Sequence, residues 1–190
     1  KDPGFYGYPA ENVTGIREVI PFNETMELFR KIYPDIKKVM MLSDFSPTTT
    51  ATVEYIKSVN NTIELDPVKE PRSFNEWKEA VEWANKNAQA INIYRYHNLK
   101  NELGETVISH DVMKWTVEHS DLPIFSCLSF GIDDGGLCGV VESGIQQGKD
   151  AASISVKLLE GEPISAFPIQ MATQYHSKVN VATARRLGIE

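Results

Sequence analysis

The sequence contains little that would hold the chain together covalently or carry it across a membrane. It has two cysteines, Cys127 and Cys138, in 190 residues, which is too few for a disulfide framework. It has no run of about 18 apolar residues, the length that a helix needs to cross a bilayer. We expect both cysteines to be small core residues, with a single bridge between them as the alternative.

Clusters of positive charge are also missing. The chain has 19 Lys and Arg against 26 Asp and Glu, for a formal net charge of -7, and no block of basic residues. Nucleic acids and anionic membrane surfaces are bound by basic patches, so neither is expected as a partner. The 42% hydrophobic and 24% charged residues are typical of a globular chain. The length fits one domain or two small lobes.

Motifs for catalysis or for cofactors are missing as well. The segment Gly144–Asp150 departs from a P-loop, because it is one residue short between glycines and has Asp150 where Ser or Thr should bind magnesium. No G-x-S-x-G motif is present. The histidines lack metal-ligand spacing; they are His97, His110, His119 and His176. The sequence therefore predicts a protein that is not an enzyme and has no metal or cofactor.

Apolar segments of strand length alternate with segments of helical periodicity. The strands are expected near residues 38–42, 62–65, 90–94 and 123–127, and helices over 24–33, from 47 to about 58, and after Ser73 and Ser109. These strands are apolar without alternation, which is typical of a parallel sheet covered on both faces. The sequence predicts an α/β fold with three layers, α/β/α, and a mainly parallel sheet.

Helix starts are marked by four polar residues. Ser46 precedes Pro47, which suits a first helical position, and Ser73 with Glu76 forms a capping box. Asn23 and Ser109 are predicted caps of two further helices.

After Ser129 the chain becomes rich in glycine. Strands are expected at 140–141, 167–171 and 179–181, and helices at 149–159 and 182–187. These strands are too few for a separate sheet, so this part must pack against something else.

Polar side chains follow three of the predicted strands. Since ligands bind at the carboxyl ends of strands in an open parallel sheet, we expect these three strand ends to line one edge. The hydroxyl-rich helix start after Asp44 adds free N–H groups and the positive end of a helix dipole, which favour an anionic or polar ligand. The predicted ligand-binding residues are Asp44, Ser46, Thr48, Thr49, Tyr96, Asn98, Ser129 and Asp134.

Several segments, in order along the chain, resemble the ABC-transporter substrate-binding family of the type I periplasmic-binding-protein fold. They are Asn12-Val13-Thr14-Gly15, Pro34–Val39, Leu122–Ser126, the helix exit Leu159–Pro163 and Val179–Ile189. Asp44 to Thr48 and Gly136–Gly148 resemble the branch fused to sensor histidine kinases. The resemblance implies a two-lobed protein that closes on an amino acid or similar small molecule outside the cytoplasm, with a membrane anchor as an open possibility.

The resemblance also implies roles and boundaries. Ser46, Thr48 and Thr49 match a segment that contacts ligand, and Asn98 falls where the family often has an Asp-Asn pair, with His97 replacing the Asp. Residues 1–20 would be a hinge and first-lobe remnant, 21–136 the second lobe, and 137–190 a return segment toward the first lobe that ends in a helix. We expect a carboxy-terminal piece of a longer protein, holding half of a cleft.

Three functions follow as hypotheses. The first is capture of a small polar solute such as an amino acid for a membrane permease. The second is an extracytoplasmic sensor domain, in which the same closure reports to a fused signalling module. The third is a flavodoxin-like enzyme, which would need a perturbed acid or base such as His97 with Asp134.

Overall fold

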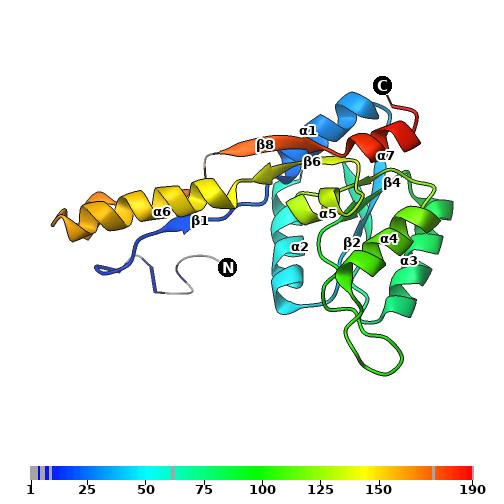
Figure 1. Ribbon diagram of the computed structural model, residues 1–190, viewed down its shortest axis with the longest axis horizontal. Helices are drawn as coiled ribbons and strands as arrows, with labels where there is room; N and C mark the ends of the chain where they lie inside the picture. The colour runs from blue at the N-terminus through cyan, green and yellow to red at the C-terminus, as the bar shows by residue number, and fades with distance from the viewer. Residues whose placement is uncertain (1–3, 5–6, 9, 61–62, 173, 190) are drawn as a thin grey trace. The chain divides into compact units, whose positions relative to one another are not determined.

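The computed structural model describes the chain except residues 1–3, 5–6, 9, 61–62, 173 and 190. The chain divides into two compact units (Figure 1). Unit 1 consists of Lys1–Ile20 and Glu142–His176, and unit 2 of Pro21–Val141 and Ser177–Glu190. Unit 2 holds every predicted ligand-binding residue.

A six-stranded sheet forms the centre of unit 2, in the order β3-β2-β4-β5-β6-β8. The pairs from β3 to β6 are all parallel. The predicted α/β fold with a mainly parallel sheet is therefore confirmed. The strands are β2 Lys38–Leu42, β3 Glu64–Lys69, β4 Ala90–Ile93, β5 Ile124–Phe125, β6 Cys138–Glu142 and β8 Tyr175–Val179.

Helices cover both faces of this sheet; they are α1 Phe22–Ile32, α2 Pro47–Val59, α3 Phe74–Asn87, α4 Ser109–His119, α5 Ser129–Asp133 and α7 Val181–Arg186. Two predicted caps are confirmed, because Ser46 accepts from the N–H of Thr49 and Ser73 forms the capping box with Glu76. Two were wrong. Asn23 lies inside α1, where its Nδ2 donates to the carbonyl of Val59, and Ser109 is the first residue of α4 rather than its cap.

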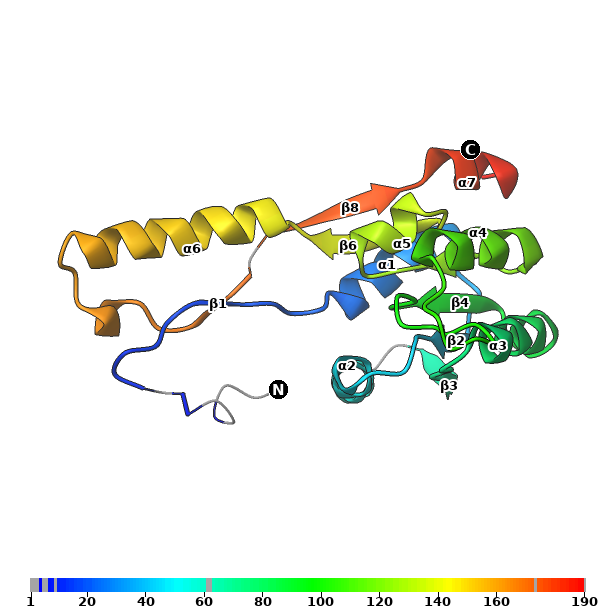
Figure 2. The same cartoon turned by 60° about the horizontal axis from the view of Figure 1, so that its bottom comes forward.

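The face under α3 and α4 holds one hydrophobic cluster. Met40 and Leu42 of β2 and Ile91 and Ile93 of β4 point to this face, since residues two apart in a strand share a side, and they pack with Trp77. The indole of Trp77 donates to Thr116 Oγ1 over 2.8 Å, which ties α3 to α4. Figure 2 shows the two helices side by side against the sheet.

The opposite face is packed by α1 and α2. The ring of Phe29 in α1 stacks on Phe125 of β5 at 4.3 Å between centroids, and Val39 and Met41 are fully buried. Both cysteines are free and buried, as expected for core residues. Burial raises the pKa of each thiol to about 12, so neither is a reactive thiolate at neutral pH.

The second strand begins and ends later in the chain than the sequence predicted. Strand β3 begins at Glu64 and continues through Pro67 to Lys69, rather than ending before the proline; the expected first residue, Thr62, lies outside the described residues. Strand β3 is at the edge of the sheet, and an edge strand tolerates proline because one side of its backbone needs no ladder bond.

The carboxy-terminal third also differs from the expectation. Strand β6 pairs with β5 and joins the main sheet, and the last strand is β8 at Tyr175–Val179, with Val181 in α7. Helix α6 spans Gly144–Leu159 and begins five residues earlier than predicted, because the Ser143 hydroxyl accepts from the Gln146 N–H. Unit 2 includes residues 137–141 and 177–190, which the sequence had assigned to the return segment.

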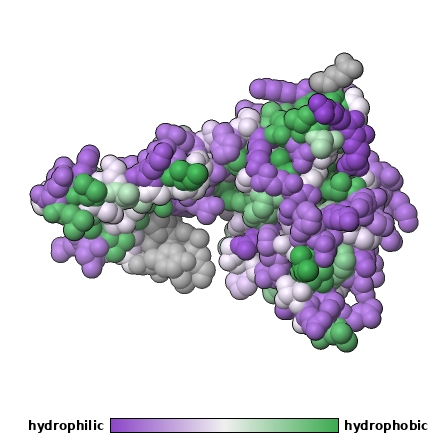
Figure 3. All heavy atoms as spheres, in the orientation of Figure 1, coloured by the Kyte–Doolittle hydropathy of each residue, from purple (hydrophilic) through white to green (hydrophobic). Residues whose placement is uncertain are grey.

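Unit 1 is small and sparsely packed. Strands β1 Ile16–Arg17 and β7 Gln170–Met171 pair in parallel, and the Val19 N–H donates to Glu142 Oε1 over 2.8 Å. Ile145, Val156 and Leu159 of α6 are exposed, in keeping with the green side chains among purple ones along this helix in Figure 3. In the described part of the chain, no helix is both long and apolar enough to span a membrane.

Candidate functional site

The side chain of Asp44 joins the ends of β2 and β4. It is fully buried, and its Oδ2 accepts hydrogen bonds from the backbone N–H groups of His97, at 2.6 Å, and Asn98, at 2.8 Å. Its Oδ1 accepts from the hydroxyl of Thr49 at 3.3 Å. Asp44 therefore fixes the loop after β4 against the start of α2, and its oxygens are occupied within the protein.

The start of α2 supplies three hydroxyls with different surroundings. The Ser46 Oγ accepts from the Thr49 N–H at 3.1 Å and donates to Thr49 Oγ1 at 3.0 Å. Thr49 is buried, whereas Thr48 is exposed. Ser46 and Thr49 thus build the helix start, and Thr48 presents its side chain to solvent.

A second cluster connects β4 with α5. The hydroxyl of Tyr96 donates to Asp134 Oδ2 at 2.7 Å and lies 3.3 Å from the Phe130 carbonyl. Burial of the phenol, followed by the nearby Asp134 carboxylate, raises the pKa of Tyr96 well above its ordinary value. The other Asp134 oxygen lies 3.2 Å from His110 Nδ1. Asp134 therefore holds Tyr96 and α4 in place.

Ser129 belongs to a separate cluster. Its hydroxyl lies 2.6 Å from Nζ of Lys178 in β8 and donates to Asp133 Oδ2 at 3.2 Å. The Lys178 ammonium beside Asp133 lowers the pKa of that carboxyl. This cluster joins α5 to β8.

The three strand ends lie at one edge of the sheet. Asp44 bonds to the segment after β4, and the Tyr96 ring in that segment stacks on His97 at 4.9 Å and reaches Asp134. Asn98 is exposed, so its side chain faces solvent. Contact of Asp44, Ser46, Thr48, Thr49, Tyr96, Asn98, Ser129 or Asp134 with a ligand stays a prediction.

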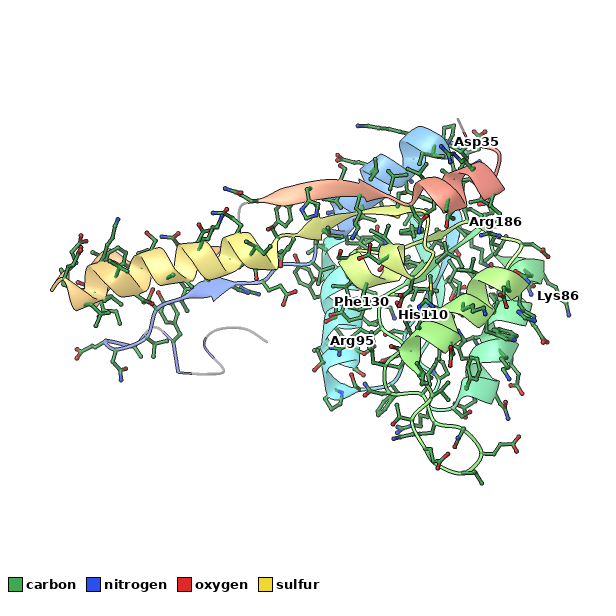
Figure 4. The ribbon with its side chains drawn as sticks, in the orientation of Figure 1. Asp35, Lys86, Arg95, His110, Phe130 and Arg186 are labelled. Carbon is green, nitrogen blue, oxygen red and sulfur yellow. The ribbon has the colours of Figure 1, made fainter. Side chains whose placement is uncertain are left out.

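The enzyme hypothesis would need an acid or base such as His97 with Asp134; among the described residues, His110 is the histidine that lies beside Asp134. Sequence reasoning also missed Arg95 and Phe130. Figure 4 shows Arg95, His110 and Phe130 gathered at the same end of unit 2, away from Lys86 and Arg186. The Phe130 ring meets His97 edge-on at 4.7 Å. The sequence pattern hardly marks Arg95 and Phe130, because Arg95 follows an ordinary strand and Phe130 lies in a helix too short to show periodicity.

The edge also carries an exposed aromatic ring. The Arg72 guanidinium carbon lies 3.5 Å from the ring centroid of Phe45, which is the third residue after the end of β2. Together with Thr48 and Asn98, this ring gives the edge both polar and flat apolar surface, which suits recognition of a small organic molecule. Among the described residues, no three His, Cys, Asp or Glu side chains are grouped so that they could hold a metal ion.

The sequence matches the model of a known protein family. A model of the family described as ABC transporter substrate binding protein matches residues 6–190. The chain therefore belongs to the ABC transporter substrate-binding protein family, as the resemblance indicated. No curated protein matches it significantly.

Solved structures share the fold. The ligand-free, open structure of CD0873, a substrate binding protein with adhesive properties from Clostridium difficile, has a TM-score of 0.75 at 18% identity, over 100% of this chain and 65% of that one. The ABC domain in complex with L-Trp from Streptococcus pneumonia has a TM-score of 0.66 at 23% identity, over 94% and 60%. A conserved domain protein from Vibrio cholerae has 0.67 at 18%, over 94% and 59%. The chain thus spans less than two thirds of the length of each.

Proposed function

We propose that the edge formed by the ends of β2, β4 and β5 in unit 2 contacts a small polar solute, such as an amino acid, which the protein captures without changing it. The observation that carries this proposal is the convergence of the three strand ends, held together by Asp44 and by the Tyr96–Asp134 bond. Membership in a substrate-binding family supports it. So do two solved structures of similar fold, an ABC domain in complex with L-Trp and an ABC transporter solute binding protein with bound myo-inositol.

The predicted residues divide into two roles within this proposal. Thr48 and Asn98 are exposed and would touch the solute. Asp44, Ser46, Thr49, Tyr96 and Asp134 are engaged with each other or with neighbouring residues and would hold those contacts in place. Ser129 would act through Lys178, which already holds its hydroxyl.

The test is calorimetric titration of the intact protein with a panel of L-amino acids and polyols. We expect saturable binding that Thr48→Ala and Asn98→Ala both weaken, whereas Lys86→Ala, an exposed change on α3, leaves it unaltered. Mass spectrometry of the recovered solute should show no change in mass. If no solute on the panel binds, the proposal fails; if both variants bind as well as the unchanged protein, the site lies elsewhere.

We propose a membrane permease as the partner and an extracytoplasmic location, with a fused signalling module as the second candidate partner. Membership in the ABC transporter substrate-binding family supports the permease. Labelling of intact cells with a membrane-impermeant amine reagent tests the location, and crosslinking with a permease tests the partner. Labelling only after lysis, or crosslinking to a kinase module instead, would contradict these assignments.

A further inference from the structure

Two buried nitrogen atoms at the end of β4 have no hydrogen-bond partner. They are Nε of Arg95 and Nδ1 of His97. In the described part of the chain the only other buried side-chain nitrogen or oxygen in this condition is Oδ1 of Asn23, in α1. Buried polar atoms are nearly always paired, so two unpaired nitrogens two residues apart need an explanation.

The two side chains belong to the segment that follows β4. Both follow Ile93, the last residue of β4, and both are half-buried, whereas Tyr94 and Tyr96 are buried. The backbone of this segment is fixed, because Arg95 N–H donates to Ser43 Oγ at 3.1 Å and His97 N–H to Asp44. The backbone that carries both unpaired nitrogens is therefore held in place.

The charge of Arg95 has no partner within the described residues either. The ion pairs found there join His110 to Asp134 and Lys178 to Asp133. The nearby Asp44 carboxylate accepts from two backbone N–H groups and a hydroxyl, and Asp134 accepts from Tyr96. This edge of the sheet therefore has spare donors, while its carboxylates are already occupied.

We infer that the Arg95 guanidinium and the His97 imidazole bind a carboxylate group of the solute. A guanidinium offers donors in a planar fork that matches the two oxygens of a carboxylate. His97 Nδ1 can donate as well when that nitrogen carries the proton. The Phe130 ring packs edge-on against His97, with 4.7 Å between the ring centroids, and an apolar neighbour lowers the local dielectric, which strengthens such bonds. This inference rests on the proposed function and narrows the solute to carboxylic acids.

A ligand-binding role for Arg95 predicts that its replacement affects stability and binding in opposite directions. An arginine kept for a ligand leaves unmet donors in the free protein, which costs stability. Arg95→Gln should therefore keep or raise the melting temperature without solute and remove the rise that solute causes. An arginine with a structural role would behave in the reverse way, because Arg95→Gln would lower the melting temperature of the free protein.

The experiment compares L-amino acids with the corresponding carboxamides as probes of the intact protein. We expect the acid to bind and the amide to bind far more weakly. Arg95→Gln should weaken binding of the acid about 10- to 100-fold, as expected for loss of a charge-assisted contact, and Arg95→Lys should restore part of it. Arg186→Gln, the same change on the exposed helix α7, serves as the control and should bind normally.

Each contrary result has a distinct meaning. Equal binding of acid and amide, or an Arg95→Gln variant that binds the acid normally, would overturn the carboxylate assignment and leave solute capture standing. Failure of acids, amides and polyols alike would overturn the proposed function together with it.

Discussion

Asp44 and His97 are joined by a hydrogen bond of 2.6 Å from the backbone N–H of His97 to Oδ2 of Asp44, although 53 positions separate them in the chain. The same oxygen accepts from Asn98, and the residue is fully buried. One carboxylate thus sets the distance between the two loops that carry Thr48 and Asn98. The arrangement of the proposed site depends on it more than on any exposed residue.

Replacing Asp44 with Asn should therefore destabilise the protein. An amide presents one acceptor oxygen and one NH₂ group where the carboxylate receives three donors, so either the two backbone N–H groups or the Thr49 hydroxyl lose their acceptor. We expect a loss of about 2–4 kcal/mol in the free energy of unfolding, measured with urea. Asp35→Asn, an exposed change in the loop after α1, should cost less than about 0.5 kcal/mol. Equal effects of the two variants would contradict the role given to Asp44.

Tyr96 should make stability depend on alkaline pH. Burial raises its pKa in the folded state, so the folded protein keeps the phenolic proton after the unfolded chain has lost it. This contribution is complete below about pH 10, the ordinary tyrosine pKa, and falls as pH rises above it. The fall approaches about 1.4 kcal/mol per pH unit.

The variant Tyr96→Phe isolates this effect. At neutral pH it should be less stable by about 1–2 kcal/mol, because Asp134 loses a donor. Above about pH 10 the difference should shrink, since the variant lacks the titrating group. Urea unfolding of both proteins at several pH values measures it. A gap that stays constant with pH would show that Tyr96 ionises alike in both states.

Ser46 and Thr48 should separate helix capping from ligand contact. Ser46→Ala removes the cap of α2 and should cost about 1 kcal/mol of stability. Thr48→Ala removes an exposed hydroxyl and should change stability by less than about 0.5 kcal/mol. Thermal unfolding tests both, and titration with solute should show that only Thr48→Ala weakens binding without loss of stability. If Thr48→Ala lowered stability and Ser46→Ala did not, the assignment of Ser46 as the cap of α2 would be wrong.

Gly139 and Gly148 should respond in opposite ways to alanine. A Cβ at Gly139 would lie 1.7 Å from the Ser126 carbonyl oxygen, so the β5–β6 contact cannot accommodate it. We expect Gly139→Ala to cost more than about 4 kcal/mol. At Gly148, inside α6, nothing lies within 4 Å of the added Cβ, and Gly148→Ala should stabilise by up to about 1 kcal/mol. Melting temperatures and soluble yields measure both effects; a well-folded Gly139→Ala variant would contradict the packing described.

Local patterns in the sequence predicted the parts of the fold that depend on local interactions. Ser46 before Pro47, and Ser73 with Glu76, bond to backbone groups within three residues, so sequence alone reveals them. Asn23 was misassigned because burial of Phe22 at the start of α1 decides where that helix begins, and burial depends on tertiary packing.

The candidate site was predictable only in outline. The order of strands and polar residues placed three loops at one edge, which the structure shows. Arg95 was missed because the feature that marks it is a buried side-chain nitrogen without a hydrogen-bond partner, and a sequence does not reveal hydrogen bonding. Whether its nitrogen has a partner depends on which donors Asp44 accepts, and that pairing joins residues more than fifty positions apart.

Strands β6 and β8 are neighbours in the sheet, although the chain between them runs through unit 1. Neighbouring strands lie about 5 Å apart, so the chain segment that connects β6 to β8 forms a loop whose two ends are close together. The entropic cost of closing a loop rises only with the logarithm of its length. The six-stranded sheet can therefore carry this insertion at little more cost than a much shorter connection, and changes of length within unit 1 should leave the nucleation of unit 2 almost unaffected.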